Sequence, residues 1–234
     1  MSIVFIISAP SGSGKSSIVA GILSHVTNLD FSISYTTRLP RGSEKNGREY
    51  YFVSVLAFEK MIRDGDFLEY ATLFGNGGDY YGTARRFLEE AEQHGHDLLL
   101  DIDVQGAEQV KRKLPDAVSI FVLPPDRLTL ERRLRNRGSD SEDKISKRLA
   151  TAAREIENYE KYDYILVNDR LEESTECLRS VLLAERFKRT GSLGATPDPG
   201  ILTLAEQCRL ENVKERVKPI LDSFRSSDGA ASSS

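Results

Sequence analysis

The first apolar run of the chain, residues 3–7, is an unbroken series of β-branched and aromatic side chains. Such a run predicts a strand that is buried on both faces of a sheet. A loop of small residues follows, and apolar side chains then recur with helical spacing over residues 18–23. This spacing predicts a helix that begins near Lys15. The chain is therefore expected to open with a buried strand, a small-residue loop and a helix.

The same two patterns recur along most of the chain. Further strands are predicted at residues 30–38, 50–53, 67–71, 73–74, 96–103, 118–123 and 164–168. Further helices are predicted at residues 55–63, 83–93, 105–113, 126–158 and 171–189. Strands that alternate with helices indicate an α/β fold with a parallel, doubly wound sheet and right-handed crossovers.

Residues 34–83 interrupt this alternation with several short strands and one short helix. Polar turns are expected at residues 40–47 and 75–79, and Ser54 has the position of an N-cap for the helix that follows it. The segment is therefore predicted to be a small, mostly β insertion in the α/β frame.

The C-terminal part has a different composition. Residues 190–200 are rich in Gly, Pro, Ser and Thr and predict a linker, whereas residues 228–234 are expected to be disordered. Between them an apolar stripe predicts a helix whose face docks on the domain, and an oligomer contact is the alternative. Pro219 argues against a long coiled coil. The residues of this stripe are Leu210, Val213, Val217, Ile220 and Phe224.

Length and charge narrow the class of protein. The 234 residues suit one α/β domain with an insertion or an extension, and the net charge of −4 is unsuited to general nucleic-acid binding. The first apolar run is too short for a signal segment or a membrane span. Cys177 and Cys208 lack metal-like spacing, which indicates reduced thiols and a cytoplasmic location. The oligomeric state, monomer or homo-oligomer, stays open.

The three histidines, His25, His94 and His96, are not spaced as a ligand set. Any metal is therefore expected to arrive with a nucleotide.

The loop between the first strand and the first helix has the features of a phosphate-binding loop. Gly12 and Gly14 allow successive N–H groups to point at one anion, Lys15 supplies a charge to the β- and γ-phosphates, and the Ser16 hydroxyl is placed to hold Mg²⁺. Ala9 stands where the general motif has glycine, so its φ must be negative. A glycine-rich turn without a ligand is the alternative, which the Lys-Ser pair directly after a strand disfavours. The residues expected to contact ATP are Ala9, Pro10, Ser11, Gly12, Ser13, Gly14, Lys15, Ser16 and Ser17.

A second candidate anion site follows the second predicted strand. Arg38 and Arg41 flank a turn stiffened by Pro40, and tyrosines follow from Tyr50 onward. Guanidinium groups and phenol hydroxyls suit a second phosphate, although a solvated basic turn is the alternative.

Four motifs in this order resemble guanylate kinases of the bacterial type. They are the loop at residues 8–17, the Thr-Thr-Arg…Tyr stretch at 36–52, Tyr-Tyr-Gly-Thr at 80–83 and Leu-Asp-Ile-Asp-x-Gln-Gly at 100–106. The resemblance covers residues 3 to about 189. It implies transfer of the γ-phosphoryl group of ATP, with Mg²⁺, to GMP or dGMP, giving ADP and GDP or dGDP in purine nucleotide metabolism.

The resemblance also implies a division of the chain. A P-loop kinase core would comprise residues 1–33 and 84–189 and include a helical lid at about 126–150. Residues 34–83 would form the GMP-binding subdomain. A linker at 190–200 and a C-terminal helix with a disordered tail at 201–234 would complete the chain.

The resemblance assigns the site residues of this chain. It places the GMP phosphate on Arg38, Arg41, Tyr50 and Tyr81, and the guanine on Ser34, Glu69, Thr83 and Asp101. The candidate arginines of the lid include Arg132, Arg133 and Arg135. The resemblance implies that two further lid arginines, Arg137 and Arg148, reach the ATP phosphates. It also places Asn168 near this region. It thereby gives catalytic roles to Lys15, Arg38, Arg137 and Arg148, and it leaves Asp103 as an outer-shell or a structural acid.

The chemistry of guanine agrees with Glu69 as a base-reading residue. Guanine presents N1–H and N2–H₂ as adjacent donors, which one carboxylate accepts together, whereas adenine has an acceptor at N1. Hydroxyl groups of Ser34 or Thr83 can donate to guanine O6. One departure is the additional Gly77, Gly78 and Asp79, which leave open whether Tyr80 or Tyr81 meets the phosphate.

Two other functions are consistent with parts of the pattern. A guanylate-kinase-like binding module without catalysis would keep the fold, but such modules usually lose the loop lysine and the lid arginines. A kinase for another phosphorylated acceptor, such as a ribosyl bisphosphate, would not need the Glu69, Ser34 and Thr83 set.

Overall fold

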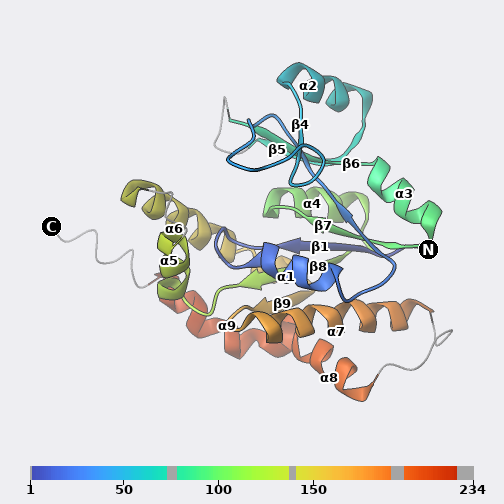
Figure 1. Cartoon of the computed structure of the whole chain (residues 1–234). Helices are drawn as coiled ribbons and strands as arrows, with labels where there is room; N and C mark the ends of the chain where they lie inside the picture. The colour runs from blue at the N-terminus through green and yellow to red at the C-terminus, as the bar shows by residue number, and fades with distance from the viewer. Residues whose placement is uncertain (1, 73–77, 137–140, 191–197, 226–234) are drawn as a thin grey trace. The chain divides into compact units, whose positions relative to one another are not determined.

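The computed structural model describes residues 2–72, 78–136, 141–190 and 198–225 (Figure 1). Contacts divide the chain into two compact units. Unit 1 comprises Met1–Ile7 and Thr27–Val118, and unit 2 comprises Ser8–Val26 and Ser119–Ser234. No helix in these described ranges has the length and the apolar character needed to cross a membrane.

Unit 1 contains parallel strands in the order β2 (Leu29–Ser32), β7 (Asp97–Asp101) and β1 (Val4–Ser8). All five residues of β1 are buried, as the unbroken apolar run predicts. The side chain of Asp97 is buried as well, and its Oδ1 accepts a hydrogen bond of 2.8 Å from the main-chain N–H of Ile3. Two helices, α3 (Arg86–His94) and α4 (Val104–Lys113), belong to the same unit.

A second sheet in unit 1 corresponds to the predicted β insertion. Its order is β4 (Tyr51–Phe52), β3 (Tyr35–Thr36), β6 (Tyr80–Ala84) and β5 (Phe67–Thr72), and β6 runs antiparallel to both of its neighbours. The helix α2 (Val55–Asp64) packs on this sheet, since the ring of Phe58 stacks on Phe67 and Tyr80 with centroids 4.5 and 5.1 Å apart. Ser54 caps this helix as predicted, and its hydroxyl accepts a hydrogen bond from the N–H of Ala57.

Two of the sequence predictions in this region are wrong. Residues 30–38 do not form one strand, because β2 pairs with β7 whereas β3 pairs with β4 and β6 in the other sheet. The helix predicted from Thr83 begins only at Arg86, since Thr83 lies in β6. In both cases pairing with strands distant in sequence decides the structure. Residues 73–77 of the predicted extended segment and turn lie outside the described residues.

Unit 2 contains the parallel pair β8 (Val118–Leu123) and β9 (Tyr164–Val167), and every side chain of β8 is buried. Its helices are α1 (Lys15–Leu23), α5 (Arg127–Asn136), α6 (Glu142–Ile156), α7 (Leu171–Thr190), α8 (Pro199–Gln207) and α9 (Leu210–Arg225), with the 3₁₀ helix η1 (Tyr159–Lys161). Strands that alternate with helices in both units confirm the α/β fold with a parallel sheet.

The C-terminal part folds onto unit 2. Val213, Val217, Ile220 and Phe224 of α9 are buried, so the apolar stripe docks on the domain as predicted. The predicted linker is wrong at its end, because Pro199 and Gly200 open α8, where Pro occupies a first-turn position and Asp198 caps the helix. The rest of that linker, residues 191–197, and the predicted disordered tail lie outside the described residues.

Candidate functional site

The loop between β1 and α1 turns on two glycines in the left-handed region. Gly12 has φ of 97° and Gly14 has φ of 92°, and the N–H of Ser13 donates to the carbonyl of Pro10 at 3.1 Å. Asn28 is the only non-glycine residue with positive φ in the described ranges. The φ of Ala9 is therefore not positive, as its sequence position requires.

Side chains from α5 and from the end of β9 pack directly on these glycines. A Cβ added at Gly12 would lie 2.9 Å from methyl carbons of Leu130 and Leu134, and one at Gly14 would lie 2.2 Å from Nδ2 of Asn168. Glycine is required at both positions because the backbone conformation and the available space exclude a side chain.

Asn168 and Arg133 hold the main chain of the loop through hydrogen bonds to its carbonyl groups. Asn168 is 4% exposed and its Nδ2 donates to the carbonyl of Ser13 at 2.6 Å. The guanidinium group of Arg133 donates to the carbonyls of Asn168 at 3.0 Å and Ser13 at 3.5 Å. Arg133, one of the lid candidates, thus braces the loop together with Asn168.

Several polar groups of the loop are available for a ligand. The Oγ of Ser13 and the Oδ1 of Asn168 are buried and have no hydrogen-bond partner among the described residues. Ser16 and Ser17 are exposed in the first turn of α1, where the leading N–H groups of a helix lack intrahelical partners. The loop therefore combines main-chain donors, orphan polar atoms and the half-buried Lys15.

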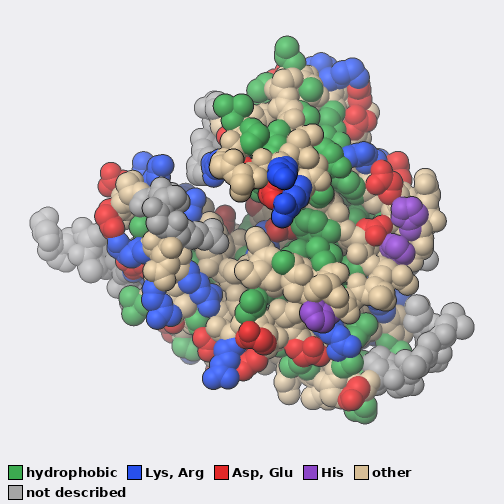
Figure 2. Space-filling view, viewed as in Figure 1, with side chains coloured by type: hydrophobic (Ala, Val, Ile, Leu, Met, Phe, Trp, Pro, Cys, Tyr) green, Lys and Arg blue, Asp and Glu red, His purple; other side chains and the backbone are tan. Residues whose placement is uncertain are grey.

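The remaining lid candidates lie on two charged helices of unit 2. Figure 2 shows basic side chains mixed with acidic ones over α5 and α6. The guanidinium group of Arg135 pairs with Glu131 at 2.9 Å and with Glu142, whereas Arg132 is exposed. Arg148 lies on α6, and Arg137 lies outside the described residues.

In unit 1, Arg38 is the centre of the second candidate site. Its side chain is 8% exposed and forms a bidentate ion pair with Glu44, with N–O distances of 2.9 and 3.0 Å. Arg38 also donates through Nε to the hydroxyl of Tyr81 at 3.2 Å and through Nη1 to the carbonyl of Leu39 at 2.7 Å. Four of its five N–H groups therefore have partners, and the fifth has none among the residues that the structure describes.

Glu44 is a residue of this candidate site to which the sequence reasoning gave no role. The Arg38 guanidinium, as the main cause, holds the pKa of Glu44 below its usual range. The same carboxylate accepts a hydrogen bond of 2.7 Å from the main-chain N–H of Arg41. The side chain of Arg41 is exposed and forms no hydrogen bond with residues in the described ranges. Arg38 is thus held in place, while Arg41 is available to an incoming anion.

The two tyrosines beside the additional residues have different contacts. Tyr81 contacts Arg38, whereas the ring of Tyr80 stacks on Phe58. Tyr50 lies under the Arg38 guanidinium at 5.2 Å and packs edge-on against Tyr81. Burial first, and the charge of Asp101 second, raise the pKa of Tyr50, which places Asp101 in the same group.

Glu69 and Thr83 stand opposite each other on neighbouring strands of the second sheet. Glu69 is 4% exposed, and burial, with a smaller contribution from the charge of Asp103, raises the pKa of Glu69 to about 7. Thr83 is fully buried, and its hydroxyl has no hydrogen-bond partner among the described residues. A buried hydroxyl group without a partner, next to a buried carboxyl group, indicates a site that a ligand completes.

Side chains of α4 hold β5 on both sides of Glu69. The side-chain amide of Gln109 donates to the carbonyl of Tyr70 at 2.8 Å and accepts from its N–H at 3.3 Å, and Lys113 donates to the carbonyl of Leu68. A Cβ at Gly106 would come within 2.7 Å of Glu69 Oε2, so α4 approaches the carboxyl group closely.

Asp103 and Ser34 complete the predicted set. Asp103 is the N-cap of α4, and its Oδ1 accepts a hydrogen bond of 2.8 Å from the N–H of Gly106. Ser34 is half-buried between β2 and β3, and its carbonyl accepts from the N–H of Tyr51.

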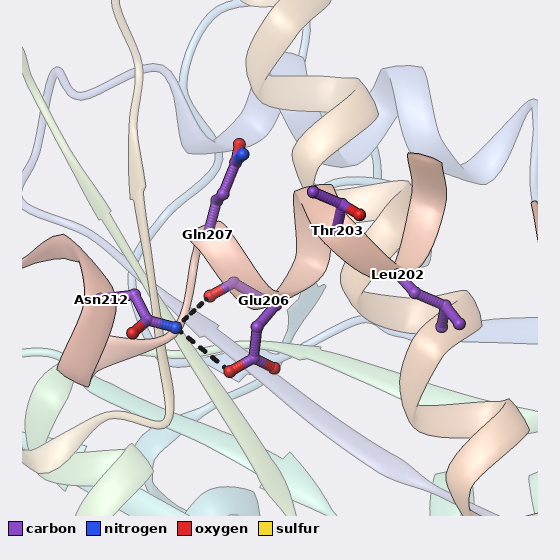
Figure 3. A pocket seen from close by; sticks show the side chains of 5 residues that line it. All are labelled: Leu202, Thr203, Glu206, Gln207 and Asn212. Atoms are coloured by element: carbon purple, nitrogen blue, oxygen red, sulfur yellow. Dashed lines mark hydrogen bonds between the residues drawn. The ribbon is translucent and has the colours of Figure 1, made fainter. Parts of the chain in front are cut away.

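A separate cavity of about 520 Å³ lies at α8 and α9 of unit 2 (Figure 3). Its polar side chains bind one another, since Nδ2 of Asn212 donates to the carbonyl and to Oε1 of Glu206. We assign no ligand to this cavity. The residues that line it are Leu202, Thr203, Glu206, Gln207 and Asn212.

Comparisons with known proteins agree with these features. The family model described as "Guanylate kinase" matches residues 1–185. A guanylate kinase of Koribacter versatilis is 54% identical over 225 residues, which cover 95% of each chain. One of Xylella fastidiosa is 47% identical over 186 residues, or 80% of this chain and 90% of the relative.

A solved structure of a guanylate kinase is also similar to this chain. The crystal structure of a guanylate kinase from Anaplasma phagocytophilum superposes with a TM-score of 0.65 at 32% identity, covering 88% of this chain and 94% of the other. The match to the Koribacter versatilis relative extends into the region beyond residue 190, because it spans 225 of the 234 residues.

Proposed function

The chain belongs to the guanylate kinase family, whose members transfer a phosphoryl group from ATP to GMP, and we propose that two groups of its residues carry this reaction. The loop between β1 and α1 in unit 2 binds ATP. The Arg38 and Glu69 groups in unit 1 bind GMP or dGMP. The lid helices supply additional positive charge.

The ATP phosphates lie on the loop that Gly12 and Gly14 shape. Its N–H groups and the N-terminus of α1 bind the phosphate oxygens, and Lys15 binds the β- and γ-phosphates. The bracing contacts of Arg133 and Asn168 with the Ser13 carbonyl support this role, because they fix the loop before the nucleotide arrives. The residues proposed to contact ATP are Ala9, Pro10, Ser11, Gly12, Ser13, Gly14, Lys15, Ser16, Ser17, Arg137 and Arg148.

Mg²⁺ fits this half of the site through Ser16. The Ser16 side chain is exposed in the first turn of α1, beside Lys15, and its hydroxyl forms no hydrogen bond with the described residues. When bound with ATP, the ion neutralises charge on the β- and γ-phosphate oxygens. Hydroxyl oxygen is a donor that Mg²⁺ accepts alongside phosphate oxygens and water.

The GMP phosphate binds to Arg41 and to the remaining N–H of Arg38, with the hydroxyl groups of Tyr50 and Tyr81. The guanine binds to Glu69 and Thr83, with Ser34 and Asp101 at its edge. The observation that carries this proposal is the opposed pair Glu69 and Thr83, since burial raises the pKa of Glu69 and the buried hydroxyl of Thr83 has no hydrogen-bond partner among the described residues. A carboxylate there accepts N1–H and N2–H₂ of guanine together.

Catalysis then consists of positioning and charge neutralisation. The acceptor is a phosphate oxygen that is already ionised at neutral pH, so no general base is needed. We propose that Lys15, Arg38, Arg137 and Arg148 stabilise the charge that spreads over the transferring group. Closure of the lid excludes water from it.

The substrate specificity is tested by measuring ADP release with a panel of acceptors. We expect turnover with GMP and dGMP and little with AMP, CMP or UMP, because Glu69 would face the lone pair of adenine N1. A ribosyl bisphosphate serves as the further acceptor. Equal or faster turnover with that acceptor or with AMP would contradict guanine recognition, and absence of turnover with every acceptor would point to a binding module.

We also propose the division of the chain that the motifs imply. A kinase core would comprise residues 1–33 and 84–189 with a lid at about 126–150, and residues 34–83 would bind GMP. The free Cys177 and Cys208 support a cytoplasmic location, where such thiols stay reduced.

A further inference from the structure

Two histidines and one aspartate form a cluster in unit 1 that has no role in nucleotide binding. One ligand atom of each of Asp30, His94 and His96 lies within 4.8 Å of the other two. Nδ1 of His96 lies 2.9 Å from Oδ1 of Asp30, and Nδ1 of His94 lies 3.6 Å from Oδ2. The spacing of the histidines in the sequence did not indicate this cluster, because folding brings Asp30 to them from 66 positions before His96.

Regular structure fixes the main chain of all three residues. Helix α3 ends at Gly95 with φ of 67°, where the N–H of Gly95 donates to Glu92 and that of His96 donates to Ala91. This pair of hydrogen bonds is a Schellman motif, which sets His94 and His96 on either side of one turn with their rings 5.6 Å apart. Asp30 lies in β2, paired with Leu98 of β7.

We propose that Asp30, His94 and His96 bind a divalent transition-metal ion, for which Zn²⁺ is the best match. Two imidazole nitrogens, one carboxylate oxygen and a water form a tetrahedral set that zinc uses. With bonds of about 2.0–2.1 Å, neighbouring ligand atoms of a tetrahedron lie roughly 3.3 Å apart. The 2.9 and 3.6 Å separations join the two histidines to different oxygens of Asp30, and a set with one ligand atom from each residue lies within 4.8 Å, so the ligand atoms need to move closer by less than about 2 Å.

The site is accessible to an ion from solvent. The side chains of His94, His96 and Asp30 are 63, 33 and 35% exposed, so small rotations can close the widest separation. The face drawn in Figure 2 shows adjoining histidine side chains beside acidic ones. Imidazole ligands favour Zn²⁺ over Mg²⁺, which prefers oxygen ligands and water. The site would thus differ from the Mg²⁺ that accompanies ATP.

Binding would link separate elements of unit 1. The ion would connect β2 to the turn between α3 and β7. Because the unfolded chain does not hold the three ligands together, Zn²⁺ is expected to raise the midpoint of thermal unfolding.

The test is titration of Zn²⁺ into the full chain without a histidine tag, by calorimetry and by thermal unfolding, with Mg²⁺ present in excess. We expect one saturable site per chain. His94→Ala, His96→Ala and Asp30→Asn should each weaken it about tenfold or more and remove the thermal shift. The matched control is His25→Ala, which removes the third histidine, an exposed ring beside the carbonyl of Gly21.

The proposal is overturned if no saturable binding appears, or if the variants bind Zn²⁺ as the unmodified chain does. It is also overturned if His25→Ala loses the site to the same extent. Cys177→Ser is included because thiols bind zinc, and loss of the site in that variant alone would assign it to the cysteines. Circular dichroism of each variant separates loss of the ligand from loss of the fold.

Discussion

Glu69 is a buried carboxyl group, and in the proposed function its ionisation and the binding of guanine depend on each other. Its pKa of about 7 arises mainly from burial among β5, β6 and α4, where the protein offers few groups that stabilise the charge. Guanine would supply the missing partners through N1–H and N2–H₂. Ionisation of Glu69 is therefore unfavourable in the free protein, and bound guanine would lower the free energy that this ionisation costs.

Without ligand, the free energy of unfolding should depend on pH through the ionisation of Glu69. The folded pKa of Glu69 lies above its unfolded value of 4.5, so the stability it contributes is present below about pH 4.5 and is lost as the pH rises through about 7. Glu69→Gln does not ionise. Its free energy of unfolding relative to the unmodified chain should rise between pH 4.5 and 8 by on the order of 3 kcal/mol.

Urea unfolding at pH 5 and pH 8 measures this difference. Glu92→Gln is the control, because Glu92 is exposed at the end of α3 in the same unit. A difference between Glu69→Gln and the unmodified chain that does not change with pH would mean that Glu69 ionises as an ordinary surface acid.

The sequence indicated the role of a residue where a local motif and its chemistry agree. It did not indicate a role that depends on a side chain elsewhere in the fold. Lys15, Gly12 and Gly14 follow from the spacing around one loop. The role of Glu44 does not follow from the sequence, because the pattern of the turn does not show which carboxylate pairs with the Arg38 guanidinium group. The ion pair of Arg38 with Glu44 explains why one arginine is held and Arg41 is available.

Helix α5, which belongs to the proposed lid, also packs against the loop between β1 and α1. Leu130 and Leu134 pack against Gly12, and Arg133 donates to the carbonyls of Ser13 and Asn168. The charge density of residues 126–158 predicted a helix but did not show which arginine points inward. That choice depends on the packing of α5 against the loop, which lies more than a hundred positions earlier in the chain.

The prediction for this element is that Arg133→Ala weakens use of ATP more than use of GMP. Loss of the hydrogen bonds that brace the loop should raise the KM for ATP roughly tenfold, which corresponds to about 1.4 kcal/mol. Steady-state kinetics with each nucleotide varied in turn checks this. Arg179→Ala is the control, since Arg179 pairs with Glu176 on α7. An unchanged KM for ATP in Arg133→Ala would show that the bracing contacts do not matter.

At the scale of the whole molecule, the order of strands, helices and motifs was enough to predict the α/β fold and the family. The errors fall where pairing partners are remote, as at residues 30–38, or where a proline and a capping aspartate start a helix inside a linker-like composition, as at Asp198 and Pro199. The cluster of Asp30 with two histidines was missed for the same reason. Local pattern predicts elements, whereas contacts between distant elements require the folded chain.

The central claim is that ATP and GMP bind to separate groups of residues, with Lys15 in unit 2 and Glu69 in unit 1. Calorimetric titration of each nucleotide alone into Lys15→Ala and Glu69→Ala tests it most directly. We predict that Lys15→Ala loses at least about tenfold in affinity for ATP and retains GMP binding, and that Glu69→Ala shows the reverse. Loss of both nucleotides in each variant, or unchanged ATP binding in Lys15→Ala, would contradict the account.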